Sequence, residues 1–131
     1  MMKKIIRLLL FPVLMALATQ AWSSTVVQIY SCAQEENASE EQIEAHVSKW
    51  LKAAKKTKGG EHLEVQLYFP MAAQMNQHDF MLVLTAPSFA DWGVFMDGQH
   101  DSEHGQIEDE FTDLAACPDS ALFESITIKA E

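Results

Sequence analysis

Residues 39–69, SEEQIEAHVSKWLKAAKKTKGGEHLEVQLYF, pass from a helical pattern to a strand pattern across two glycines. Ser39 and Gln42 have the spacing of a capping box, which predicts that a helix begins here. Apolar residues then recur on one helical face, at Ile43, Val47, Trp50, Leu51 and Ala54. Gly59 and Gly60 predict the end of the helix, and the alternation of apolar and polar side chains over residues 63–69 predicts a half-buried strand.

Three further strands and a second helical region surround this segment. β-Branched residues predict a strand over 25–31, and a more apolar run predicts another over 80–85. Residues 88–115 predict a helix in two pieces, and residues 122–129 predict a closing strand. The order β-α-β-β-α-β is that of a ferredoxin-like α+β fold. We therefore expect an antiparallel four-stranded sheet with the helices on one face.

The first 21 residues have the features of a secretory signal peptide. They combine three basic residues with an apolar run over 8–18, and small residues then offer cleavage after Ala18 or Ala21. The run is too short to cross a bilayer, which needs about 20 residues. We predict one domain over residues 22–131 of a bacterial periplasmic or secreted protein, with no membrane association after cleavage.

The charge of the chain excludes one class of partner. The net charge is −10, and the predicted signal peptide holds three of the nine basic residues and none of the 19 acids, so the mature chain would carry −13. Such a charge repels phosphate, and we expect no nucleic-acid partner.

The two cysteines predict a disulfide. In an exported protein an even pair is usually bridged, and no Cys-x-x-Cys motif indicates a redox-active pair. Cys32 follows the predicted first strand and Cys117 precedes the predicted last one. These two strands are antiparallel neighbours in the predicted topology, so both cysteines fall at the same edge of the sheet.

The sheet face away from the helices is the first candidate binding surface. Its predicted side chains mix aromatic, apolar and amide groups: Gln28, Tyr30, Glu64, Gln66, Tyr68, Met81, Val83, Thr85, Phe123, Ser125 and Thr127. Two such faces in a homodimer could enclose a small hydrophobic or aromatic ligand, contacted by Gln28, Tyr30, Gln66, Tyr68 and Trp92. A solvated face is the alternative, and a shift of one residue in a strand would exchange its faces.

A family resemblance supports this picture. The strand over residues 80–84, the segment Ser88–Trp92 and a broken helix with His100 and His104 resemble the dimeric α+β barrel superfamily, which includes antibiotic-biosynthesis-monooxygenase-like and stress-responsive barrel proteins. The resemblance implies a homodimer. It also implies an alternative function, a cofactor-free monooxygenase-like enzyme acting on an aromatic or haem-like substrate, with Trp92 and His100 or His104 as catalytic candidates. Haem-degrading members use an asparagine in the first strand, where this chain has Gln28.

Metal binding is a third hypothesis. His100 and His104 are four residues apart, a spacing that can place both on one helix face for zinc. Met71, Met75 and His78 offer thioether and imidazole ligands that suit copper(I). A solvated helix junction and an exposed hairpin are the competing interpretations of these two segments. No motif indicates a bound cofactor, so we expect none.

Overall fold

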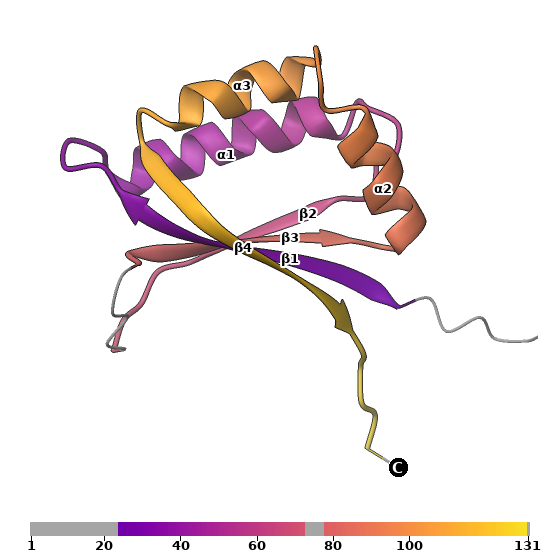
Figure 1. Cartoon of the computed structure of the whole chain (residues 1–131). Coiled ribbons are helices and arrows are strands. Elements are labelled where there is room, and N and C mark those ends of the chain that lie inside the picture. The colour runs from indigo at the N-terminus through magenta and orange to yellow at the C-terminus, as the bar shows by residue number, and fades with distance from the viewer. Residues whose placement is uncertain (1–23, 73–77, 131) are drawn as a thin grey trace, which may run out of the picture.

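The computed structural model describes residues 24–72 and 78–130 (Figure 1). The predicted signal peptide and Met75 therefore lie outside the described residues. The elements are β1 (Thr25–Gln34), α1 (Glu40–Ala54), β2 (Glu64–Tyr68), β3 (Phe80–Ala86), α2 (Phe89–Asp97), α3 (Glu103–Phe111) and β4 (Ala115–Ser125). The strands form one antiparallel sheet in the order β2-β3-β1-β4, with the helices over one face. This confirms the ferredoxin-like fold. None of the described helices combines the length and apolarity needed to cross a membrane.

Local sequence signals set the limits of the helices. Ser39 accepts a hydrogen bond from the backbone of Gln42, whose side chain accepts one from the backbone of Ser39, so the predicted capping box begins α1. After α1, Gly59 has a φ of +84°, a backbone conformation that favours glycine. A Cβ atom at Gly59 would lie 2.5 Å from the Asp91 carbonyl oxygen, so the close approach of α2 also requires a glycine.

The core lies between the helices and the sheet. One buried cluster gathers Phe95 of α2 with Val26 and Leu84 of the two central strands. A second gathers Ile43 of α1 with Phe80 of β3 and Cys32 of β1. Both clusters lie on the same face of the sheet, and no described helix covers the other face.

The faces of β1 are the reverse of the prediction. Val26 is buried under the helices, and Gln28 and Tyr30 lie on that same side. Val27 and Ile29 lie on the helix-free face, where they pair with Thr85 and Val83. The prediction was wrong because β1 is a central strand with apolar residues on both faces, so hydrophobicity does not fix its phase. The predicted faces of β2 and β3 agree with the structure.

The last strand also begins earlier than predicted. β4 runs from Ala115, so Cys117 lies within the strand and Thr127 lies beyond it. Pro118 is tolerated because β4 is an edge strand, where a missing backbone donor can face solvent. A disulfide joins Cys32 to Cys117 across the β1–β4 pair, as predicted.

Candidate functional site

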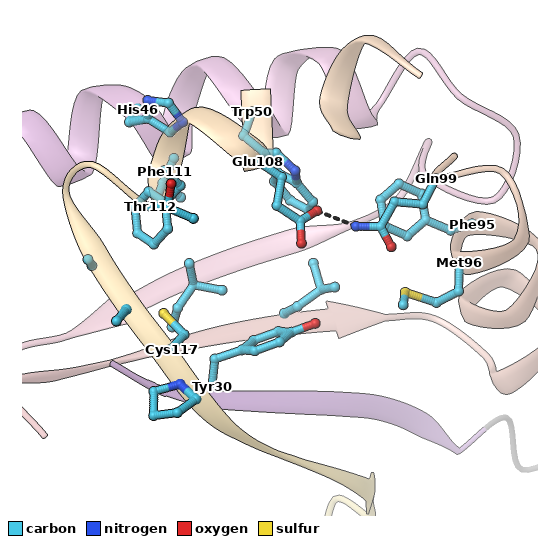
Figure 2. A pocket seen from close by; sticks show the side chains of 16 residues that line it. Tyr30, His46, Trp50, Phe95, Met96, Gln99, Glu108, Phe111, Thr112 and Cys117 are labelled. Atoms are coloured by element: carbon cyan, nitrogen blue, oxygen red, sulfur yellow. Dashed lines mark hydrogen bonds between the residues drawn. The ribbon is translucent and has the colours of Figure 1, made fainter. Parts of the chain in front are cut away.

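A cavity of about 420 Å³ lies between the helices and the sheet (Figure 2). Aromatic and aliphatic side chains form most of its wall, and they include Tyr30, Trp50, Leu82, Leu84, Phe95, Met96 and Phe111. Cys117 and Pro118 of β4 complete one side. Natural small-molecule pockets have a similar size and a similar apolar lining.

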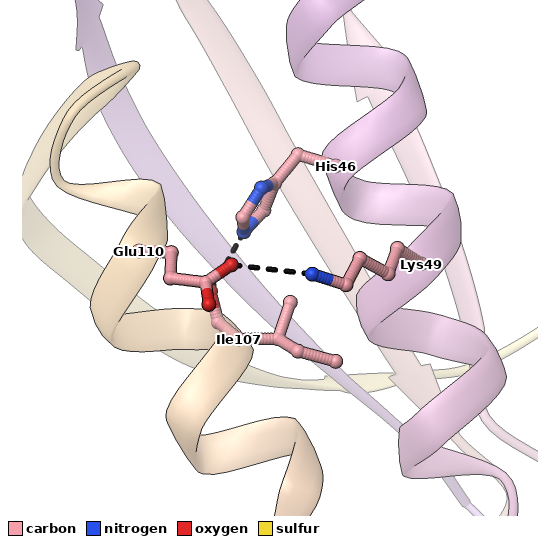
Figure 3. A network of polar contacts seen from close by, with 4 residues as sticks. All are labelled: His46, Lys49, Ile107 and Glu110. Carbon is pink, nitrogen blue, oxygen red and sulfur yellow. Dashed lines mark hydrogen bonds and ion pairs between the residues drawn. The ribbon is translucent and has the colours of Figure 1, made fainter.

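The position of α3 leaves this space open. α3 packs chiefly against α1, and β4 extends beyond the cover of the helices. Figure 3 shows the contact: His46 Nε2 lies 2.7 Å from the Ile107 carbonyl oxygen, and Lys49 Nζ lies 3.2 Å from Glu110 Oε2. The His46 ring therefore donates to α3, and α3 remains next to α1 instead of lying directly on the sheet above β4.

A small polar group interrupts the apolar wall. The Gln99 side-chain amide donates a hydrogen bond to one carboxylate oxygen of Glu108, and the other oxygen is directed into the cavity (Figure 2). The Trp50 ring nitrogen is buried and, within residues 24–72 and 78–130, has no hydrogen-bond partner. Tyr30 brings a phenol from the floor of the cavity.

Burial and neighbouring groups shift the pKa values of Tyr30 and Glu108. Burial, and then the charge of Glu108, raise the pKa of the Tyr30 phenol to about 12, against the opposite effect of a hydrogen bond with Gln28. Burial also raises the pKa of Glu108, and Asp109 adds to this effect, while the hydrogen bond from Gln99 opposes it. Tyr30 is therefore a neutral hydroxyl at neutral pH, able to donate and accept hydrogen bonds.

The predicted ligand contacts fall in three places. Tyr30 lines the cavity. Gln28 and Trp92 lie beside it and bind each other, since the Trp92 ring nitrogen donates to Gln28 Oε1 at 3.1 Å. Gln66 and Tyr68 are on the helix-free face, where the Tyr68 hydroxyl donates to Gln66 Oε1 at 2.8 Å. The structure therefore does not bring the five residues together.

The catalytic candidates lie apart from the cavity lining as well. His104 is fully buried, with its ring stacked on Phe95 at a centroid distance of 4.8 Å. His100 is exposed and precedes α3, so the two histidines do not share a helix face, and the predicted zinc geometry was wrong. The ring nitrogen of Trp92 already donates its hydrogen bond to Gln28.

The metal hypothesis finds no cluster in the described part of the chain. Residues 24–72 and 78–130 bring together no group of three or more His, Cys, Asp or Glu side chains suited to a metal ion. His78 Nε2 lies 3.7 Å from Asp119 Oδ2, and Met71 is fully exposed. Met75, the third candidate ligand for copper, is outside the described residues.

Sequence reasoning missed the polar group of the cavity. Trp50 falls on the apolar face predicted for the first helix, and no local pattern distinguishes Glu108 or Gln99 from the other polar residues of this acidic chain. Glu108 lies four residues after the buried His104 and one after the buried Ile107, and neither spacing is a motif for a polar group in a cavity. Only the packing of α3 on α1 brings these side chains to the cavity.

Solved structures share the fold. A dimeric ferredoxin-like protein of unknown function from Thermobifida fusca YX superposes with a TM-score of 0.54 at 11% identity, over 79% of this chain and 93% of that one. A DABB family protein with a ferredoxin-like fold from Mesorhizobium loti MAFF303099 gives 0.52 at 6% identity, over 82% and 100%. No family model matches the chain, and no curated protein matches it. At these identities the likeness shows the fold alone.

Proposed function

We propose that this ferredoxin-like chain is an exported protein that binds a small hydrophobic or aromatic molecule. The observation that carries the proposal is the cavity of about 420 Å³, whose wall is mostly aromatic and aliphatic with a few polar groups at one end. Apolar walls supply affinity, and a few fixed polar groups orient the ligand. In this proposal Tyr30 contacts the ligand inside the cavity, not on the helix-free face where it was predicted, and Gln28 and Trp92 support the neighbouring wall.

A homodimer is the second part of the proposal. The helix-free face carries apolar and aromatic side chains on all its strands, among them Ile29, Tyr68, Val83 and Phe123. Phe123 is 49% exposed and Tyr68 48% exposed in the single chain. An apolar sheet face of this kind is typical of a protein–protein contact. The similar protein from Thermobifida fusca is described as dimeric, which is consistent with pairing through this face. Light scattering should then give twice the mass of the chain, and a monomer would contradict the pairing.

The cysteine pair supports export. A disulfide between distant positions persists in an oxidising compartment and is rare in the cytosol. The predicted signal peptide gives the route, with cleavage after Ala18 or Ala21 as the expected processing.

A fluorescence titration tests the cavity. The neutral dye N-phenyl-1-naphthylamine brightens in apolar sites and should bind the oxidised protein. Met96 of α2 directs its side chain into the cavity (Figure 2), so Met96→Trp should fill part of it and weaken dye binding by about ten-fold, the effect of a blocked apolar contact worth about 1.4 kcal/mol. Ala90→Trp on α2 is the matched control, because Ala90 is exposed and is not part of the cavity wall. Equal affinity in all three proteins would refute the proposed site.

A further inference from the structure

The cavity has a charge that its lining does not neutralise. Neither lysine nor arginine is among the described residues that line it, and its one carboxylate is Glu108. Two other acids of α3 are paired with lysines of the α1 region: Glu110 with Lys49 at 3.2 Å, and Glu103 with Lys56 at 3.6 Å. Within the described residues Glu108 has no ion pair, and the side-chain amide of Gln99 holds it instead.

The orientation of this carboxylate matters as much as its charge. Gln99 fixes one oxygen, and the second oxygen points into the cavity, above the ring of Tyr30 (Figure 2). Neutral donors hold a carboxylate in place without cancelling its charge, so an incoming cation meets a positioned counter-ion. Trp50, Tyr30 and Phe111 surround this space with aromatic rings. Aromatic faces attract organic cations through their quadrupoles, and tryptophan does so most strongly.

We propose that the ligand of this cavity is an organic cation, an amine or quaternary ammonium attached to an apolar or aromatic body. The inference rests on the proposed function and specifies its ligand class. The ammonium lies against the free oxygen of Glu108, and the apolar body lies on the aliphatic floor of the cavity between α1 and the sheet. An anion of the same size is rejected, since it would face Glu108 with no positive side chain to offset the repulsion.

Three indoles of nearly equal size separate charge from shape. Tryptamine is a cation at neutral pH, tryptophol is neutral and indole-3-acetate is an anion. Isothermal titration of the oxidised protein should rank them in that order. Tryptamine should bind about ten-fold more tightly than tryptophol, as expected for a cation held by aromatic rings and a facing carboxylate. Equal affinity for the three indoles would overturn the inference.

Two variants on the same helix show whether the preference for a cation comes from the cavity or from the overall charge of the chain. Glu108→Gln should bring the tryptamine-to-tryptophol affinity ratio to about one, because the local counter-charge is lost. Glu103→Gln removes the same charge from α3 but lies outside the cavity wall, so it should leave the ratio unchanged. If both variants lose the preference equally, the attraction comes from the overall negative charge of the chain and the inference fails.

The pH dependence gives an independent measurement. The titratable groups around Glu108 are the Tyr30 phenol on β1, His46 on α1 and the neighbouring Asp109. Protonation of Glu108 should weaken tryptamine binding as the pH falls, and Glu108→Gln should remove that part of the decline. The dye separates the two levels of failure. If N-phenyl-1-naphthylamine binds and Met96→Trp blocks it while tryptamine shows no preference, only the cation inference fails; if the dye does not bind, the proposed function fails too.

Discussion

The stability of the protein should fall as the pH drops below about 6.5, because His104 is buried in its neutral form. The Ser102 hydroxyl donates to the Gln99 carbonyl at 2.6 Å, so its oxygen is left to accept from the Gly105 N–H and from His104 Nε2–H, which lies 3.3 Å away. This places the proton on Nε2. Nδ1 is buried and has no partner among the described residues. A second proton there would create a buried cation against the Phe95 ring.

The direction of the pKa shift of His104 gives the sign of the change in stability, and the uptake of one proton sets its upper limit. Burial lowers the pKa of His104 below the ordinary value of 6.5, so below that pH the unfolded chain binds a proton that the folded chain does not. The stabilising contribution is complete above the unfolded pKa and is lost as the pH falls toward the lowered folded pKa. The loss is at most about 1.4 kcal/mol per pH unit for one group, a substantial part of the roughly 5–15 kcal/mol of a typical domain.

Urea unfolding of the oxidised protein between about pH 7.5 and about pH 5.5 measures this slope. The comparison is between His104→Gln, which removes the buried imidazole, and His100→Gln, which removes an exposed one in the preceding segment. His104→Gln should be less stable at high pH yet lose less stability on acidification, while His100→Gln should follow the wild-type slope. A wild-type slope in His104→Gln would refute the reasoning.

Two further predictions concern the packing around the cavity. Reduction of the Cys32–Cys117 disulfide should cost about 4–5 kcal/mol of unfolding free energy on the loop-entropy model, given its separation of 85 residues; urea curves with and without dithiothreitol measure this, and two titratable thiols in unreduced protein would contradict the bridge. Phe95→Ala should cost about 3–5 kcal/mol, because this side chain is 1% exposed at the centre of the core. The 60% exposed Phe89 provides the matched control, and Phe89→Ala should change stability by no more than about 0.5 kcal/mol in the same assay.

The order of elements was predictable because each signal for it is local. The capping box at Ser39 and the cap at Ser88, whose hydroxyl accepts from the Asp91 backbone, fix where two helices begin. The alternation over residues 63–69 fixes a strand regardless of its neighbours. The limits of β4 were missed, since Pro118 argues against a strand until the strand is known to lie at the edge of the sheet.

The phase of β1 and the cavity depend on tertiary contacts that the sequence pattern does not contain. Both faces of β1 offer apolar residues, Val26 on one side and Val27 with Ile29 on the other, and only the position of the helices decides which is the core. This reversal has a functional consequence. It brings Tyr30 under the helices, opposite Glu108, and it gives the helix-free face the more apolar residues of β1. The predicted single surface therefore becomes two: a cavity under the helices, where we propose that the ligand binds, and an apolar sheet face, where we propose that a second chain pairs.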